Sequence, residues 1–251
     1  MENNRFPREI SLCLSGGAAK GAFHLGAVSV LQEHGVKIKA ISGTSIGAFI
    51  GASLACGKSA TEIFEVIKSK EFRKVFKFKI GKDYLFELNK DESVVAKIID
   101  KNSFGELNFP LSVAVSDMNE ESIYYFDNGE DFKDLVLASC SIAPLFKTVQ
   151  IKNHLFGDGG VIDNFPVQEL LKYKYPIVGI NLYPKYNKQA TSIFAWLKKS
   201  LYIAWQSHNR EKEKLCDIYI SSDKLNNIRA FSFKDIETAY QLGREEMLKH
   251  V

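Results

Sequence analysis

The sequence predicts an α/β fold with a mainly parallel sheet, and three observations support this prediction. Two short apolar segments, residues 10–14 and 38–41, are typical of buried strands. Each runs into a glycine-containing turn and then into a segment whose apolar residues recur at helical spacing. Strand, turn and helix thus occur twice within the first 57 residues, as expected for parallel strands joined by crossover helices.

The elements follow in order along the chain. The first helix is expected at 22–34, closed by Gly35, and a second helix is expected after the turn at 43–47, up to Gly57. Residues 59–62 form a capping box that opens a helix to about Lys68. Further helices are expected at 91–101, 131–139, 191–212 and 235–249, and strands at 111–115, 122–126, 147–151, 155–156, 177–182 and 218–220. We see no repeat or linker, so one domain is expected over residues 1–251.

Composition excludes several classes of function. The 33 Lys and Arg residues against 30 Asp and Glu residues give a net charge of +3, too small for nucleic acid as the main partner. The four cysteines are scattered without a C-x-x-C pair, so neither a disulfide framework nor a zinc site is expected. The first residues lack a signal-peptide pattern, and no run reaches the roughly 18 apolar residues of a membrane-spanning helix. We therefore expect a cytoplasmic protein, although export without a signal would leave no trace.

The first candidate site is the pentapeptide at residues 43–47, which spells G-x-S-x-G. Gly43 and Gly47 allow a sharp strand-to-helix turn that presents the Ser45 hydroxyl at a helix N-terminus. There the helix dipole favours negative charge that develops during acyl transfer. A glycine-rich turn with an idle serine is the alternative.

The second candidate is the glycine-rich turn at residues 15–21. Successive backbone N–H groups in such a turn can bind a phosphate or the oxyanion of an acyl-transfer intermediate. A P-loop would need Gly-Lys-Ser/Thr, whereas Lys20 is followed by Gly21 and alanine, and G-x-G-x-x-G cannot be placed here. An anion-binding turn remains, beside the alternative of a plain connection.

The third candidate is Asp158 within the Gly-Asp-Gly-Gly segment 157–160. Asp-Gly is also an ordinary hairpin turn, so this segment alone is weak. In the usual order serine, acid, histidine, only His208 and His250 follow the acid, one in a predicted helix and one near the C-terminus. The other histidines, His24, His34 and His154, lie on the first helix or on a turn. A Ser45–Asp158 dyad is therefore the simpler prediction than a triad.

Taken together, these segments resemble the patatin-like phospholipase family of bacterial-type acyl hydrolases. Residues 16–21 are similar to its G-G-G-x-[K/R]-G loop, residues 43–47 to its nucleophile elbow and residues 158–160 to its D-G-[G/A] triplet. Residues 138–146 and 161–167 resemble two further blocks of the family, and the resemblance spans about residues 10–183. Alanine at position 18, where the family commonly has a third glycine, is a departure that would cost about 1 kcal/mol at a positive φ.

The resemblance implies a three-layer α/β/α sandwich with a mainly parallel central sheet, with residues 184–251 as a C-terminal part. It also implies a lipid acyl hydrolase of the phospholipase A or lysophospholipase type, with an acyl-enzyme on Ser45, Asp158 as the base and no metal or cofactor. The oxyanion would be bound by Gly16, Gly17 and Ala18, and the site residues that would support these loops are Lys20, Gly21, Gly43, Gly47, Gly159 and Gly160. Lys20 would fix its loop or meet a phosphate head group, or it is a solvated lysine.

A phospholipid or other acyl-lipid substrate requires contact with a lipid surface. Residues 68–82 carry seven basic residues interleaved with apolar ones, and residues 194–205 place apolar side chains on one helix face. Either segment could rest on a membrane, and for both the alternative is that the apolar residues are core. A soluble-ester or acyl-thioester hydrolase with the same dyad and a non-catalytic lipid-binding protein remain as alternative functions.

Overall fold

The computed structural model describes residues 6–89, 93–185 and 189–251. An eight-stranded sheet forms its centre, in the order β10-β9-β1-β2-β5-β8-β7, with β6 paired to β5. Its strands are β1 (Glu9–Leu14), β2 (Lys37–Thr44), β5 (Leu111–Asp117), β6 (Ser122–Phe126), β7 (Val149–Ile151), β8 (His154–Asp158), β9 (Ile177–Ile180) and β10 (Ile218–Ile220). The pairs β10–β9, β9–β1, β1–β2 and β2–β5 are parallel, and β5–β6, β5–β8 and β7–β8 are antiparallel.

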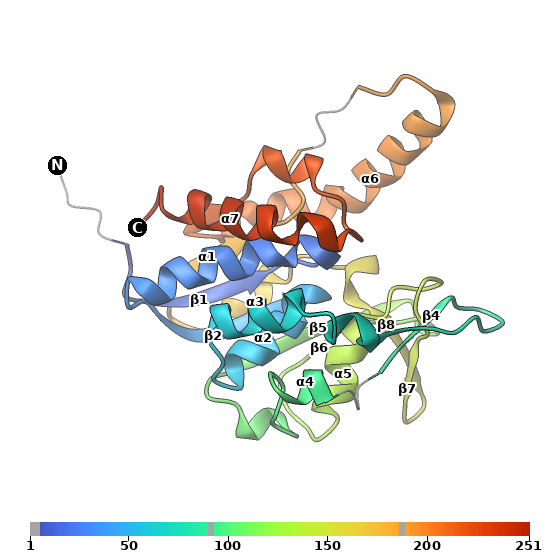
Figure 1. Cartoon of the computed structure of the whole chain (residues 1–251), viewed down its shortest axis with the longest axis horizontal. Helices are drawn as coiled ribbons and strands as arrows, with labels where there is room; N and C mark the ends of the chain where they lie inside the picture. Colours follow the sequence, from blue (N-terminus) through green and yellow to red (C-terminus); the bar gives the residue numbers. More distant parts are fainter. Residues whose placement is uncertain (1–5, 90–92, 186–188) are drawn as a thin grey trace.

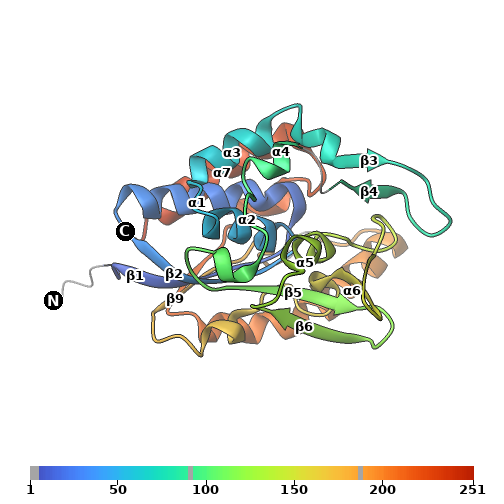
Figure 2. The same cartoon turned by 90° about the horizontal axis from the view of Figure 1, so that it is seen from below.

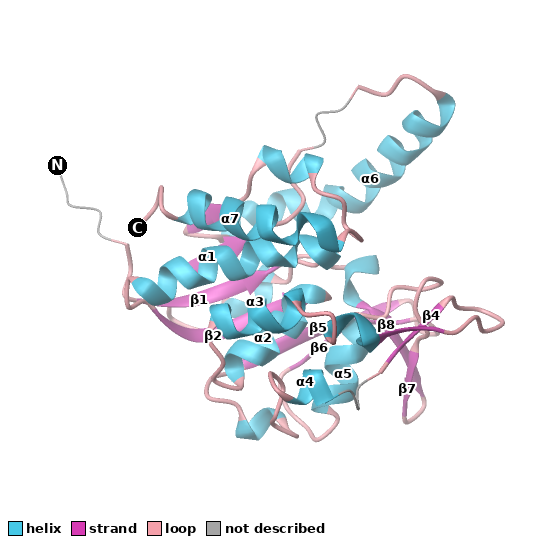
Figure 3. Ribbon diagram, viewed as in Figure 1, coloured by secondary structure: helices cyan, strands magenta, loops and turns pink. Residues whose placement is uncertain are grey.

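Helices cover both faces of this sheet (Figures 1 and 3). They are α1 (Ala22–Glu33), α2 (Ile46–Ala55), α3 (Ala60–Lys68), α4 (Ser93–Ala96), α5 (Phe132–Ser139), α6 (Ile193–Lys212) and α7 (Ile236–Met247). Figure 2 shows α1, α2, α3 and α7 on one face, with α6 on the other. The three-layer α/β/α sandwich expected from the sequence is confirmed.

The alternation of side chains along β1 divides the core between the two faces. Leu12 and Leu14 belong to the large cluster under the α1, α2 and α7 layer, whereas Cys13 points to the other face. There it packs with Phe165 and Leu170, which follow the end of β8. The segment after Asp158 is therefore held against the sheet from the side opposite α1.

The strand β5 brings the ends of two distant strands together. Thr44, the last residue of β2, pairs with Ala114, and Asp158, the last residue of β8, pairs with the next residue, Val115. Since β6 occupies the other edge of β5, β2 and β8 share one edge and meet end to end. The two candidate catalytic segments therefore meet at this point of the sheet.

The structure shortens one expected helix and adds one hairpin. The helix expected at 91–101 is only α4, because the amides of Ile98 and Ile99 both bond to the carbonyl of Val95 and close the turn, while residues 91–92 lie outside the described residues. A hairpin of β3 (Phe76–Phe78) and β4 (Phe86–Leu88), not expected from the sequence, projects from the body (Figure 2). Among the described residues, no helix is long and apolar enough to cross a membrane.

Candidate active site

Ser45 lies in the turn between β2 and α2. Its backbone has a conformation that residues other than glycine rarely adopt. Its φ is 54° and its ψ is −128°, a backbone arrangement that costs of the order of 1–3 kcal/mol. The Ser45 amide donates a 2.8 Å hydrogen bond to Oγ of Ser139, whose hydroxyl in turn donates to the carbonyl of Ala114 at 2.7 Å. Ser139, at the end of α5, thus ties the strained turn to β5.

The glycines on either side of Ser45 are required by close backbone approach. A Cβ at Gly47 would lie against the carbonyl oxygen of Leu14, and a Cβ at Gly43 would lie against the backbone of Gly47 and Ala48. Larger residues at either position would push β2, α2 and β1 apart. The elbow expected from G-x-S-x-G is present in this form.

Asp158 ends β8 beside this elbow and is 4% exposed. One of its carboxylate oxygens accepts a 2.7 Å hydrogen bond from the Gly160 amide. Burial raises the pKa of Asp158 to about 7, against hydrogen bonds from the Ser45 side chain and the Gly160 amide that lower it. The carboxylate is therefore a stronger base than a free aspartate, and it interacts with the serine that the sequence paired with it.

A second aspartate, Asp163, is held in the opposite state. Its carboxylate accepts hydrogen bonds from the Tyr125 hydroxyl (2.6 Å) and the Gln168 amide (2.7 Å) and pairs with Lys212 at 2.5 Å. Burial acts to raise the pKa of Asp163, but Lys212 and these hydrogen bonds lower it overall. Two carboxyls in one segment thus differ in basicity because of their surroundings, and only Asp158 is suited to accept a proton.

The glycine-rich turn lies next to Ser45. A Cβ built on Gly16 would be 3.1 Å from Cβ of Ser45, and the Gly16 amide donates to the carbonyl of Asn164 at 3.2 Å. Among the described residues, no hydrogen-bond acceptor is found for the amides of Gly17 and Ala18. Ala18 has a φ of 50°, so the departure from glycine falls at a position of positive φ.

A histidine that belongs to none of the sequence motifs fixes this turn. His24, on the first turn of α1, is buried and its Nε2 donates to the carbonyl of Ser15 at 2.8 Å. Burial lowers the pKa of His24 to about 4, so the ring is neutral. Gly21 sits under α2, where a Cβ would meet the side chain of Ile46.

Aromatic side chains of α6 cover the segment after Asp158. The indole N–H of Trp205 donates to the carbonyl of Gly160, and its ring packs edge-on against Tyr183 with centroids 4.7 Å apart. The Nζ atom of Lys20 lies 5.0 Å from the centre of the Tyr183 ring. Trp205 of α6, Tyr183, Lys20 and the Gly160 backbone thus pack together.

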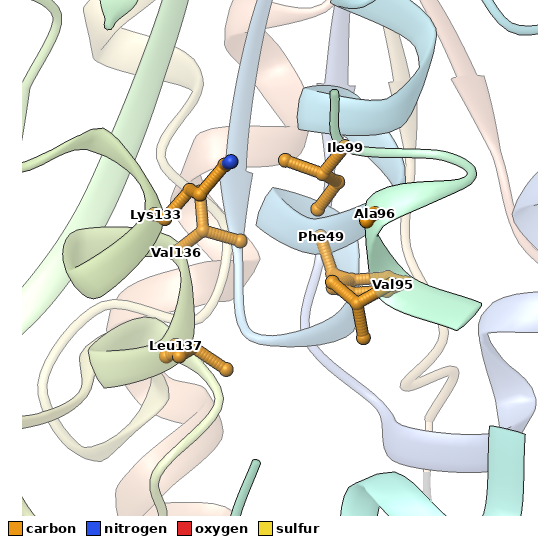
Figure 4. Close-up of a pocket in the computed structure, with 7 residues that line it drawn as sticks. All are labelled: Phe49, Val95, Ala96, Ile99, Lys133, Val136 and Leu137. Atoms are coloured by element: carbon orange, nitrogen blue, oxygen red, sulfur yellow. The ribbon is translucent and has the colours of Figure 1, made fainter. Parts of the chain in front are cut away.

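A small pocket lies one helical turn away from Ser45. It is lined by apolar residues of α2, α4 and α5 and by Lys133 (Figure 4). The lining residues are Phe49, Val95, Ala96, Ile99, Lys133, Val136 and Leu137. Its volume of about 30 Å³ is room for a group the size of a water molecule. It does not include Ser45 or Asp158, and an acyl chain would have to widen it.

One group of side chains has the composition of a metal site. Asp117, Glu120 and His154 have ligand atoms within 4.8 Å of one another. Hydrogen bonds within the protein account for this arrangement. One Asp117 oxygen accepts hydrogen bonds from the amides of Asn119 and Glu120, and the other accepts one from Nδ1 of His154 at 2.6 Å. We assign no metal to it.

The other histidines give Ser45 no partner in the described part of the chain. His34 bonds to the carbonyl of Val30 at 2.9 Å, and His154 pairs with Asp117. His208 follows Trp205 by three residues on α6, and its side chain lies outside the part that the structure describes. Whether His208 serves Ser45 is a question for the His208→Ala variant.

Sequence reasoning missed Ser139 and Trp205 as neighbours of the site. Ser139 lies in the block 138–146 that resembled the family, which was the available signal. Trp205 lies on an apolar helix stripe and carries no motif.

Comparison with known proteins identifies the family of this chain. The family model described as patatin-like phospholipase matches residues 12–171. Lysophospholipase NTE1 of Candida albicans is 27% identical over 172 residues, which cover 65% of this chain and 12% of the relative. An uncharacterised NTE family protein of Mycobacterium bovis is 26% identical over 175 residues, covering 68% of this chain and 46% of the relative.

Solved structures share the fold. VipD of Legionella pneumophila superposes with a TM-score of 0.58 at 16% identity, covering 97% of this chain and 66% of VipD. The type III effector ExoU superposes with a TM-score of 0.51 at 14% identity, covering 97% of this chain and 53% of ExoU. With a family model that matches more than half of its length and the family's motifs gathered in one site, the chain belongs to the patatin-like phospholipase family.

Proposed function

We propose that this protein is a lipid acyl hydrolase of the phospholipase A or lysophospholipase type that works through a Ser45–Asp158 dyad. The observation that carries the proposal is the position of Ser45 in a strained elbow beside a buried carboxyl group with a pKa of about 7. Membership of the patatin-like family supports an ester bond as the target. The Candida albicans relative, a lysophospholipase by name, supports a lipid substrate.

In the first step, Oγ of Ser45 attacks the ester carbonyl carbon while Asp158 accepts the hydroxyl proton. The tetrahedral intermediate then expels the alcohol, which takes that proton from Asp158, and the acyl group stays on Ser45. A base with a pKa near 7 is ionised in about half of the molecules at neutral pH and is more basic than an ordinary carboxylate. Burial therefore supplies basicity that the residue type lacks.

In the second step, a water molecule attacks the acyl-enzyme and Asp158 accepts its proton. Collapse of the second intermediate returns that proton to Oγ of Ser45 and releases the fatty acid. Both steps pass through an oxyanion, and we assign its stabilisation to the amides of Gly17 and Ala18, which follow Gly16 in the loop beside Ser45. Gly16 serves to hold the loop, because its own amide is bonded to the carbonyl of Asn164.

Labelling with a fluorophosphonate probe and peptide mapping tests the dyad. The expected result is modification of the wild type at Ser45, none in Ser45→Ala and a labelling rate at least about 100-fold lower in Asp158→Asn. The matched control is His208→Ala, which should label like the wild type. Full labelling of Asp158→Asn, or loss of labelling in His208→Ala, would refute the dyad and favour a triad.

The substrate class is tested with the same set of variants. The expected result is Ser45-dependent release of fatty acid from lysophosphatidylcholine or from phospholipid vesicles, at a higher kcat/KM than for the soluble ester p-nitrophenyl butyrate. Turnover of soluble esters or acyl-thioesters alone would contradict a lipid substrate while leaving the dyad in place. Bound lipid without turnover or labelling would indicate a non-catalytic member.

A further inference from the structure

The N-terminal half of α6 exposes large apolar side chains over one broad side of the helix. Ile193 and Phe194 are 85% and 83% exposed, and Trp196 and Leu197 are 57% and 56% exposed. At 3.6 residues per turn these four positions span one arc of about 160°, so the protein itself leaves this broad side of the helix uncovered. In Figure 1, α6 rises away from the body with this end outermost. The sequence-based alternative, that this apolar stripe is core, is therefore wrong for Phe194 and Leu197.

The C-terminal half of the same helix is fixed to the active site. Trp205 donates to the carbonyl of Gly160, directly after the Asp158-Gly159 pair, and Lys212 pairs with the buried Asp163 at 2.5 Å. Leu197 and Trp205 are separated by roughly 12 Å along the helix axis. Whatever binds the exposed half is thus held close to Ser45.

The charge around this half indicates an anionic occupant. Residues 189–209 contain two lysines, at positions 198 and 199, and no aspartate or glutamate. Nζ of Lys199 lies 5.7 Å from the centre of the Trp196 ring, which places a cation beside an aromatic side chain. Apolar residues accompanied by Trp and Lys are the composition of helices that enter the head-group region of anionic membranes.

We infer that residues 193–200 of α6 insert into the interface of an anionic lipid bilayer and hold the active site at its surface, an inference that rests on the proposed lipid hydrolase function. The apolar side chains enter the acyl boundary, Trp196 lies at head-group level and Lys199 meets lipid phosphates. A lipid ester also lies at this boundary, so a substrate has to move only a short way out of the bilayer to reach Ser45. Residues 68–82, the other basic segment, are not required for this contact.

The first test measures binding of the Ser45→Ala protein, which leaves the lipid intact, to phosphatidylcholine vesicles containing phosphatidylglycerol. The double variant Phe194→Ser/Leu197→Ser should lose at least about 30-fold in affinity, and raised salt should weaken binding at least about 10-fold. The matched control is Ile80→Ser/Leu85→Ser on the hairpin, whose side chains are 68% and 46% exposed. This control should bind like its parent.

The two tryptophans give a second, independent readout. Vesicle binding should shift the emission of Trp196 to the blue, so Trp196→Phe should lose the shift and Trp205→Phe should keep most of it. Turnover of p-nitrophenyl butyrate by the α6 double variant, made with Ser45 intact, should stay within about twofold of wild type, because the changed side chains are exposed. That assay separates failure of the membrane inference from failure of the hydrolase proposal.

Three results would overturn the inference. The first is unchanged vesicle binding by the α6 double variant, and the second is an equal loss in the hairpin control. The third is that the α6 double variant loses self-association of the chain and not vesicle binding, as measured by size-exclusion chromatography with light scattering. That result would mean that α6 binds a second copy of the chain.

Discussion

Replacing Asp158, the proposed base, should stabilise the protein at high pH. Asp158 is buried and its pKa is raised to about 7, against about 3.9 in the unfolded chain. Well below pH 4 the carboxyl is protonated in both the folded and the unfolded state, so its burial does not lower the free energy of unfolding through ionisation. Between these values the folded state binds the proton more tightly, so the free energy of unfolding falls as the pH rises. Above pH 7 the whole penalty is present, at most about 4 kcal/mol for a shift of three units.

The substitution Asp158→Asn removes this penalty because the amide is neutral at every pH. Cys140 and Tyr183, the titratable neighbours that interact with Asp158, themselves have raised pKa values and stay neutral up to pH 8. We therefore expect the stability gained by Asp158→Asn to grow by roughly 3 kcal/mol between pH 5 and pH 8. Urea denaturation at intervals across this range measures the difference.

Asp163→Asn is the matched control, since it makes the same change five positions along the chain. The pKa of Asp163 is lowered, chiefly by Lys212 against the effect of burial, so its carboxylate is ionised across the whole range. The variant should be less stable than wild type, with little pH dependence. A pH-independent effect of Asp158→Asn, or destabilisation at pH 8, would refute the raised pKa and with it the basis of the dyad.

The remaining predictions use soluble-ester turnover and denaturation. The kcat/KM of the wild type should rise with pH up to about 7 and then level off, because Asp158 must be ionised to accept the proton; a flat profile would contradict this. Ser139→Ala should lower kcat about 10- to 100-fold by freeing the elbow, whereas Ser141→Ala, which removes a hydroxyl bonded to a helix carbonyl, should not; equal effects would deny Ser139 a positioning role. Ala18→Gly should raise the free energy of unfolding by about 1 kcal/mol without loss of kcat, and a loss of stability would show that φ there is not strained. Lys212→Met should cost roughly 3 kcal/mol at pH 7, since it leaves the buried Asp163 unpaired; a change below about 1 kcal/mol would mean that the pair is solvated.

Local signals made the first part of the fold predictable. Residues 10–57 combine apolar strand segments, glycine turns and helical periodicity, each of which depends only on neighbours in sequence. The hairpin of β3 and β4 was missed because strands of three residues are too short to show alternation. The helix expected at 91–101 ends early because the amides of Ile98 and Ile99 both bond to the carbonyl of Val95, a backbone detail that periodicity does not reveal.

The same distinction applies to the site. Ser45 could be proposed from its G-x-S-x-G turn, whereas Asp158 was proposed because no histidine was suitably placed and because residues 158–160 resemble a block of the family. Ser139 and Trp205 act only through partners far away in the chain, at separations of 94 and 45 residues. A sequence read segment by segment carries no signal for such contacts. The basicity of Asp158 was equally hidden, since it depends on burial.

One carbonyl group on β5 explains why these separate motifs belong together. The oxygen of Ala114 accepts the hydroxyl of Ser139, which holds the Ser45 amide, and it is also the atom that a Cβ at Gly159 would strike. The position of Ser45 and the position of Asp158 are therefore both set relative to the same peptide group. A shift of one residue in the pairing of β8 with β5 would turn the Asp158 side chain to the opposite face of the sheet. Gly159 is thus required because it lets β8 end against Ala114, at the register that keeps Asp158 beside Ser45.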